Sequence, residues 1–186
     1  ENITITAGAR VGGLVGDAQG RIDYITAKEI NISGREYTGG IVGYTIANIT
    51  NITVDNANVE GNNYVGGIIG NVFSTATNLE IFSVNNSTIK GRNYVGGIEG
   101  YIYGYGGGKR KIFNSHIIGT EDYIGGIAGY SSGSARDYME VVNCTIEGVG
   151  ANSDYVGGFD GIGTGSIQRS FIKDSKIEAT GNYVGG

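Results

Sequence analysis

Two acidic side chains stand where this sequence otherwise places apolar or small residues. Glu99 and Asp160 each follow a Gly-Gly-apolar tripeptide. Elsewhere the same position holds Val15, Val42, Ile69 and Ala128. If these segments stack as repeats, the two carboxylates lie two layers apart, roughly 9.6 Å at twice the usual strand spacing. Inverting glycosidases use carboxylate pairs at about this separation. The position is expected to face solvent, where acidic residues are ordinary, so catalysis is the less favoured interpretation.

The stretch 101–111 departs most from the rest of the sequence. It contains Tyr101, Tyr103, Tyr105, Lys109, Arg110 and Lys111, with a run of glycines between the tyrosines and the cations. Aromatic and cationic side chains on a glycine-rich connection suit recognition of a glycan or a protein partner. We therefore predict a binding loop here. The alternative is an insertion that is tolerated between strands.

The single histidine and the single cysteine are poor catalytic candidates. His116 takes a position that holds Asn, Thr or Lys in the other repeats, which indicates a surface residue. Cys144 takes a small position that holds Ala or Ser elsewhere, which indicates a buried structural thiol without a histidine in its repeat. We expect no cofactor and no metal site.

A repeated double glycine sets out the elements that must position these residues. The pairs are Gly12-Gly13, Gly39-Gly40, Gly66-Gly67, Gly96-Gly97, Gly125-Gly126, Gly157-Gly158 and Gly185-Gly186. Successive pairs are separated by 27, 27, 30, 29, 32 and 28 residues. A period near 28 with small insertions is typical of stacked repeats, each of which packs on its neighbours.

Each repeat has two parts. The first reads Tyr-Val-Gly-Gly-Ile-x-Gly, as in 64–70, and its glycines suit a bulge or corner. The second alternates apolar and polar residues around an Asn that recurs as Asn56, Asn86, Asn114 and Asn143, a candidate turn. The pattern predicts an all-β fold, a β-solenoid of about 28-residue coils with three short strands per coil.

Composition limits the partners. The chain holds 36 glycines and no proline or tryptophan, and Ile, Val and Tyr dominate its apolar residues. A net charge of −5 disfavours nucleic acid as a partner. Because the sequence contains no long run of apolar residues, we expect no insertion into a membrane. The sequence lacks an initiator methionine and stops in mid-repeat. We therefore expect residues 1–186 to be one solenoid segment, an excerpt of a longer chain with flanking domains.

The Tyr-Val-Gly-Gly-Ile-Val-Gly-Tyr type of segment, clearest in 37–44, 64–71 and 123–130, resembles the GLUG motif. The resemblance covers nearly the whole chain. It implies bacterial exported or wall-attached proteins, including large adhesins and immunoglobulin A1-specific zinc metallopeptidases, in which the motif belongs to a non-catalytic part. The zinc signature of those peptidases, His-Glu-x-x-His, has no counterpart here.

These features together favour a non-catalytic module that serves as a spacer, an adhesive surface or a substrate-binding part of a large secreted or cell-surface bacterial protein. The expected partner is a host glycoprotein or a glycan, and the expected location is extracellular or cell-wall attached. The alternative is a polysaccharide-active β-helix enzyme that uses Glu99 and Asp160.

Overall fold

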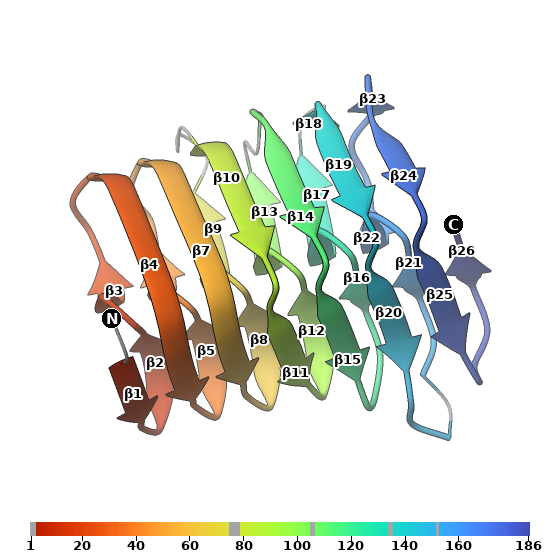
Figure 1. The fold of residues 1–186 in the computed structure, drawn as a ribbon, viewed down its shortest axis with the longest axis horizontal. Coiled ribbons are helices and arrows are strands. Elements are labelled where there is room, and N and C mark those ends of the chain that lie inside the picture. Colours follow the sequence, from red (N-terminus) through yellow and green to blue (C-terminus); the bar gives the residue numbers. More distant parts are fainter. Residues whose placement is uncertain (1–2, 75–78, 105–106, 134–135, 152) are drawn as a thin grey trace.

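The chain winds into coils that lie side by side from the N-terminus to the C-terminus (Figure 1). This computed structural model describes residues 3–74, 79–104, 107–133, 136–151 and 153–186. Within those ranges there is no helix, and every strand pairing is parallel. The described part accordingly holds no helix that could cross a membrane. The predicted β-solenoid is confirmed.

Three large parallel sheets form the walls. The seven-stranded sheet contains β2 (Ala9–Gly12), β5 (Glu36–Gly39), β8 (Asn63–Gly66), β12 (Asn93–Gly96), β16 (Ile124–Gly125), β21 (Val156–Gly157) and β26 (Val184–Gly185). The six-stranded sheet contains β3 (Val15–Ala18), β6 (Val42–Thr45), β9 (Ile69–Ser74), β13 (Glu99–Gly104), β17 (Ala128–Gly133) and β22 (Asp160–Gly163).

The eleven-stranded sheet is the longest wall. It contains β1 (Ile3–Thr6), β4 (Ile22–Ser33), β7 (Ile49–Glu60), β10 (Leu79–Asn85), β11 (Thr88–Gly91), β14 (Arg110–Phe113), β15 (His116–Gly119), β19 (Met139–Val142), β20 (Thr145–Gly148), β24 (Phe171–Lys173) and β25 (Lys176–Ala179). A short pair, β18 (Arg136–Asp137) and β23 (Ile167–Gln168), adjoins it.

Left-handed backbone positions turn the chain within each coil. The recurring asparagines adopt φ values of 57°, 49°, 49° and 52° at Asn56, Asn86, Asn114 and Asn143. Asparagine tolerates this region better than most residues, which confirms the predicted turn. The residue two positions before each double glycine is also left-handed; it is Arg10 in the first copy, at 53°, and a tyrosine in the other six, from 49° at Tyr37 to 65° at Tyr123.

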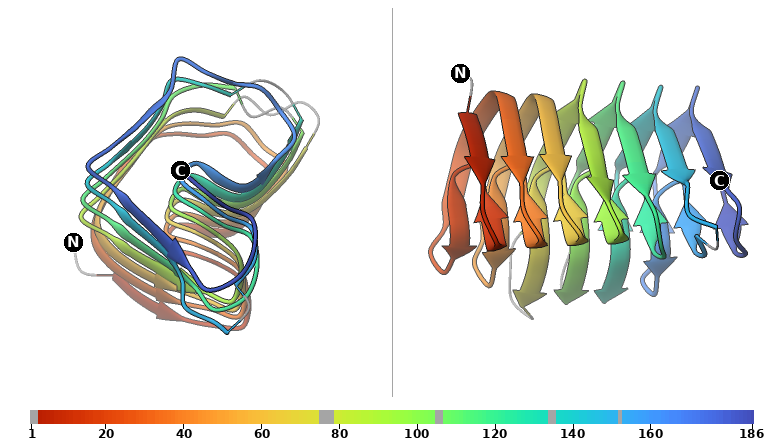
Figure 2. Two further views of the ribbon diagram at one scale, coloured as in Figure 1. Left: turned by 90° about the vertical axis from the view of Figure 1, so that its right-hand side faces the viewer. Right: turned by 90° about the horizontal axis from the view of Figure 1, so that it is seen from below.

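The double glycines form the predicted corner, because in the first six pairs the chain bends at the second glycine and the residue after it, between two strands. None of them has a positive φ. Here the chain folds inward, so that one side of the stacked coils is indented (Figure 2). A Cβ atom on Gly39 would lie 2.1 Å from the Val42 carbonyl oxygen, and one on Gly70 would lie 2.5 Å from the Tyr37 carbonyl carbon. Only glycine allows backbones of the two walls to come this close.

Stacked tyrosines line the edge of this inward fold. The rings of Tyr37, Tyr64, Tyr94, Tyr123, Tyr155 and Tyr183 form one ladder with centroid separations of 4.7–5.2 Å between neighbours. This spacing matches the strand separation, because each ring comes from the same position of the next coil. Offset stacking of parallel rings stabilises the fold beyond the effect of burying their surface.

Inward-facing apolar side chains fill the interior of the coils. Val54, Val84, Ile112 and Val141 are fully buried on one row, and Val59, Ile89, Ile117 and Ile146 on another. Both rows come from the apolar positions of the alternating second part of each repeat. These two rows are therefore columns of β-branched residues with one residue in each of four successive coils.

Candidate functional site

The outer side of the six-stranded sheet carries a cluster of aromatic side chains, which we call the aromatic face. It consists of the aromatic residues Tyr44, Phe73, Tyr101, Tyr103 and Tyr130, together with Ile46, which directly follows β6. On β13, Tyr101 and Tyr103 flank Ile102, which is 1 % exposed and lies in the core. Ile46, Phe73 and Tyr103 are 47 %, 55 % and 44 % exposed. Three neighbouring coils thus present one exposed apolar row.

The rings of the aromatic face hold one another in place. Phe73 and Tyr103 stack with centroids 5.4 Å apart, and Tyr101 and Tyr130 stack at 4.8 Å. Tyr101 also meets the edges of Tyr64 and Tyr94 in the tyrosine ladder, at 5.7 Å each. Burial, followed by the neighbouring tyrosines, raises the pKa of Tyr101 above its ordinary value. The stacked rings therefore restrain one another, and one cation adjoins the face, because the Arg10 guanidinium lies 4.5 Å from the Tyr44 ring centroid.

The structure separates the six residues predicted to form one binding loop. Tyr101 and Tyr103 lie on the aromatic face, and Tyr105 lies outside the described residues. Lys111 belongs to the eleven-stranded sheet, where it pairs with Glu140 at 2.7 Å.

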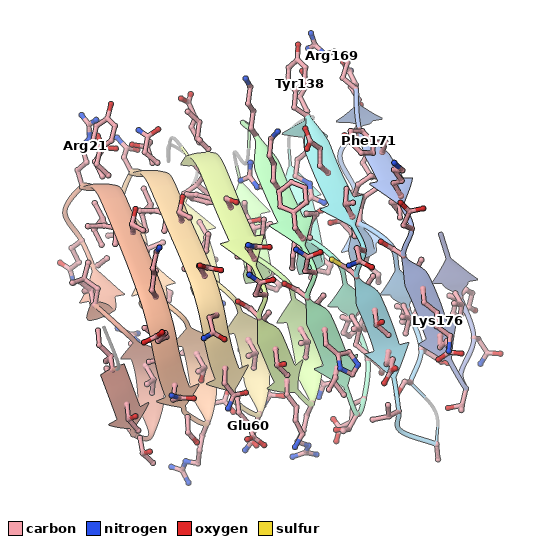
Figure 3. All side chains as sticks on the ribbon, viewed as in Figure 1. Arg21, Glu60, Tyr138, Arg169, Phe171 and Lys176 are labelled. Atoms are coloured by element: carbon pink, nitrogen blue, oxygen red, sulfur yellow. The ribbon has the colours of Figure 1, made fainter. Side chains whose placement is uncertain are left out.

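Lys109 and Arg110 complete the predicted set in different ways. The exposed Lys109 lies 5.5 Å from the ring of Tyr138, at the edge where Tyr138 and Arg169 project together (Figure 3). Arg110 is fully buried, so its expected place in an exposed loop was wrong. Its side chain points inward because it lies two residues before the inward-facing Ile112 on the same strand.

Glu99 and Arg110 form an ion pair in the interior. Both side chains are 0 % exposed. Arg110 Nε donates to both carboxylate oxygens of Glu99, at 3.0 and 3.1 Å, and Nη2 donates to Oε1 at 2.8 Å. Arg110 Nη1 donates to the carbonyl oxygens of Gly107 and Gly108, at 2.9 and 3.1 Å. The arginine thus holds the backbone at Gly107 and Gly108, just before β14.

Asp160 forms a second pair, with Arg136. Both side chains are 4 % exposed, and Ser131 Oγ donates to Asp160 Oδ2 at 2.9 Å. Burial lowers the pKa of Arg136, while the Glu99 charge opposes this shift and the Arg110 charge adds to it. The charges of the Glu99–Arg110 pair therefore influence Arg136 of the second pair.

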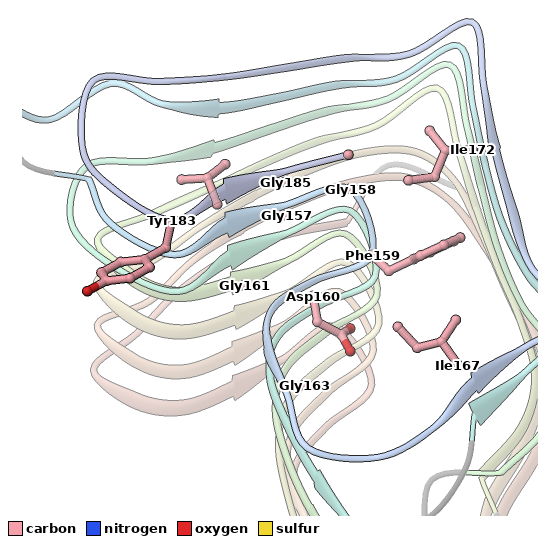
Figure 4. A pocket seen from close by; sticks show the side chains of 12 residues that line it. Gly157, Gly158, Phe159, Asp160, Gly161, Gly163, Ile167, Ile172, Tyr183 and Gly185 are labelled. Atoms are coloured by element: carbon pink, nitrogen blue, oxygen red, sulfur yellow. The ribbon is translucent and has the colours of Figure 1, made fainter.

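A cavity of about 350 Å³ opens beside Asp160 at the last coil (Figure 4). Phe159, Ile167, Ile172 and several glycines line it. The carboxylate of Asp160 is nevertheless engaged with Arg136 and Ser131 rather than free within the cavity.

The expectation that the Glu99 and Asp160 position faces solvent was wrong. It is an inward position, as its apolar occupants in the other coils required. Each carboxylate pairs with a different arginine, Glu99 with Arg110 and Asp160 with Arg136. In the described part of the chain, no group of three or more His, Cys, Asp or Glu side chains could hold a metal ion.

His116 and Cys144 occupy the positions that were predicted for them. The His116 side chain is 40 % exposed, with Nε2 3.2 Å from a carboxylate oxygen of Glu147. Cys144 is a buried free cysteine at 3 % exposure, and burial raises the pKa of its thiol. A raised pKa disfavours the thiolate that a nucleophile needs.

Sequence reasoning missed Ile46, Phe73, Tyr44, Tyr130 and Arg136. The signal for the first two was present, because Ile46, Phe73 and Tyr103 each stand seven residues after the first glycine of a pair. Tyr130 likewise matches Tyr101 in the aligned repeats. Arg136 had no comparable signal, because its partner Asp160 comes from the next coil and its connection has no regular counterpart.

Comparison with known proteins adds evidence on the fold. No family model matches this sequence, and no curated protein matches it. A solved structure described as a "putative immunoglobulin A1 protease from Bacteroides ovatus" is similar, with a TM-score of 0.52 and 19 % sequence identity. The match covers 84 % of this chain and 54 % of that chain, so this chain matches about half of that protein. At this identity the similarity shows a shared fold, and the GLUG resemblance stays a prediction.

Proposed function

We propose that this chain is a non-catalytic binding and spacer module of a larger secreted or cell-surface bacterial protein, and that its aromatic face contacts a host glycoprotein. The observation that carries the proposal is the exposed row of Ile46, Phe73 and Tyr103. Contiguous exposed apolar side chains on a soluble fold are typical of interaction surfaces.

The rigidity of the aromatic face supports a binding role. Phe73 and Tyr103 are stacked on each other and rise from strands paired in a continuous sheet. Few rotamers are lost when such a surface meets a partner, so more of the contact energy appears as affinity. Aromatic residues are also the side chains that most often dominate the energy of protein interfaces.

The buried ion pairs support a non-catalytic role. A general acid or a nucleophilic carboxylate must reach the scissile bond, whereas Glu99 is fully buried and bound by Arg110 through three hydrogen bonds. Similarity to a chain described as an immunoglobulin A1 protease fits a module beside the catalytic part of a peptidase, with immunoglobulin A1 as one candidate partner.

The proposal is tested by binding to immobilised host glycoproteins, including immunoglobulin A1 and mucin. The variant Phe73→Ser/Tyr103→Ser removes the two stacked rings from the aromatic face. Loss of contacts of this kind costs about 2 kcal/mol or more, which is roughly a 30-fold weaker affinity. Phe171→Ser is the matched control, because Phe171 is 48 % exposed on the eleven-stranded sheet.

Weaker binding by the double variant, with native circular dichroism and an unaffected Phe171→Ser control, would support the proposal. The proposal fails if the wild-type chain binds no member of the panel, or if the double variant binds as well as the wild type. Cleavage of any panel member by the purified chain, followed by mass spectrometry, would contradict the non-catalytic assignment.

A further inference from the structure

A shallow polar trough runs across the coils on the eleven-stranded sheet, away from the aromatic face. One side consists of the turn residues Glu29, Asn56, Asn86, Asn114 and Asn143, and the other consists of Asn31, Asn58, Thr88, His116 and Thr145. The small residues Ala57, Ser87 and Ser115 form the floor between them. We call this feature the amide trough. It follows the axis of the solenoid, because each member comes from the same position of a successive coil.

The two sides of the amide trough differ in their free hydrogen-bonding capacity. On the turn side, Asn143 Nδ2 donates to Asn114 Oδ1 at 2.9 Å, and Asn114 Nδ2 donates to Asn85 Oδ1 at 3.0 Å. On the other side, the side chains of Asn58, Thr88 and Thr145 have no hydrogen-bond partner within the described part of the chain. The first row is therefore held in place, while the second has donors and acceptors to offer.

The trough is almost uncharged, although the chain as a whole carries a net charge of −5. Its titratable members are Glu29 at the N-terminal end and His116, whose imidazole faces Glu147. Amide and hydroxyl groups without a dominant charge match a neutral ligand that is rich in hydroxyl groups.

The spacing of the trough favours a sugar polymer over a peptide. Neighbouring coils repeat at about 4.8 Å, whereas like-facing side chains of an extended peptide recur at about 6.7 Å, so a peptide would lose register within two or three coils. One residue of an extended glycan advances by nearly the distance of one coil. A glycan could therefore meet one amide or hydroxyl group at each coil.

We propose that the amide trough binds an extended neutral polysaccharide that lies along the solenoid axis. Asn58, Thr88 and Thr145 hydrogen-bond the sugar hydroxyl groups, and the row of turn asparagines forms the opposite wall. This site is separate from the aromatic face, so the polysaccharide and the glycoprotein would bind independently.

The test measures affinity of the purified chain for neutral soluble polysaccharides (mixed-linkage β-glucan, mannan and starch) and for charged ones (polygalacturonate and chitosan). Isothermal titration calorimetry and affinity electrophoresis supply the readout. Thr88→Val/Thr145→Val removes two hydroxyl groups while it keeps β-branched side chains suited to strands. Each lost hydrogen bond weakens binding about 2- to 13-fold, so the double variant should lose at least about fivefold.

Two matched variants separate the hydroxyl groups from general effects. Thr88→Ser/Thr145→Ser keeps both hydroxyl groups, and Thr53→Val removes an exposed hydroxyl from the same sheet outside the trough. Both should bind a neutral polysaccharide within about twofold of the wild type, since each retains the hydrogen bonds in question.

Binding of a neutral polymer that is weakened by the valine pair alone would support the proposal. It is overturned if no neutral polysaccharide binds, if only the charged polymers bind, or if the valine and serine pairs behave alike. Loss of polysaccharide binding in Phe73→Ser/Tyr103→Ser, with the valine pair unaffected, would overturn the trough assignment and leave the aromatic face as the binding surface.

Discussion

Replacing Glu99 alone should destabilise the solenoid more than replacing Glu99 and Arg110 together. Both side chains are fully buried and share three hydrogen bonds. Glu99→Ile leaves the Arg110 guanidinium buried without a counter-charge, which typically costs about 3–5 kcal/mol. In a chain of this length, each kcal/mol of lost stability lowers the melting temperature by about 2–4 °C. The melting temperature of Glu99→Ile should therefore fall by roughly 6–20 °C.

The coil before this pair shows how an apolar replacement fits. Ile69 and Phe82 pair in register with Glu99 and Arg110, and both are at most 1 % exposed. Glu99→Ile/Arg110→Phe copies that arrangement, and such replacements of a buried ion pair are often neutral or stabilising. The double variant also loses the two hydrogen bonds to Gly107 and Gly108, about 0.5–1.5 kcal/mol each. Its net loss should therefore stay below about 3 kcal/mol.

Urea unfolding of the wild type, both single variants and the double variant, followed by far-UV circular dichroism, gives the coupling energy. Hydrogen exchange at residues 99–113 adds a local measure, because stacked repeats can open one coil at a time. If Glu99→Ile is as stable as the wild type, or if the two single losses simply add, the ion pair does not act as described.

Three further predictions concern the backbone and the titratable groups. Gly39→Ala should destabilise the fold by about 1–3 kcal/mol or more, because its Cβ would lie 2.1 Å from a carbonyl oxygen, whereas Gly20→Ala meets nothing within 4 Å and should change stability by less than about 0.5 kcal/mol in the same urea assay. Burial and the adjoining tyrosines raise the pKa of Tyr94 above 10.0, so the stability that its protonated form contributes is complete below that pH and is lost as pH rises through the folded pKa. Tyrosinate absorbance that develops at the same pH in folded and urea-unfolded chains would contradict this. Hydrogen bonds from Thr50 and Asn51 hold the pKa of Asp23 at about 2, and Thr50→Val should move it toward 3.8, as followed by NMR. An unchanged value would show that the Thr50 hydroxyl is not the main cause.

Much of the fold could be predicted because the repeat makes each position visible several times. One asparagine in a strand-like segment is ambiguous, but Asn56, Asn86, Asn114 and Asn143 at one aligned position indicate a turn, and all four adopt a left-handed φ. The same alignment predicted the inward rows and the structural roles of His116 and Cys144. The residue types and the spacing of the repeats were sufficient for these predictions, because each coil repeats the environment of the preceding coil.

The candidate site was harder to predict. It consists of residues that differ from their counterparts in the other repeats, and their role depends on whether the side chain points into the core or to the surface. The sequence marked Glu99 and Arg110 as unusual, yet it did not show that both point inward and meet. Tyr101 and Tyr103 were expected on a loop with Arg110, whereas they extend along β13 beside Phe73 of the preceding coil. Contacts between coils decide such neighbours, and the residues concerned lie about 30 positions apart in the chain.

The amino-acid sequence by itself determined the all-β repeat, its period, its asparagine turns and its apolar interior, because those follow from the alternation of residues and from local backbone preferences. Only the tertiary structure decided that the double glycines, besides forming a corner, bring the backbones of two walls into contact. It also decided that two carboxylates resembling a catalytic pair are each neutralised by a buried arginine. The physical reason is the same in both cases: close packing and charge pairing depend on distances between coils, which the order of residues along one coil does not specify.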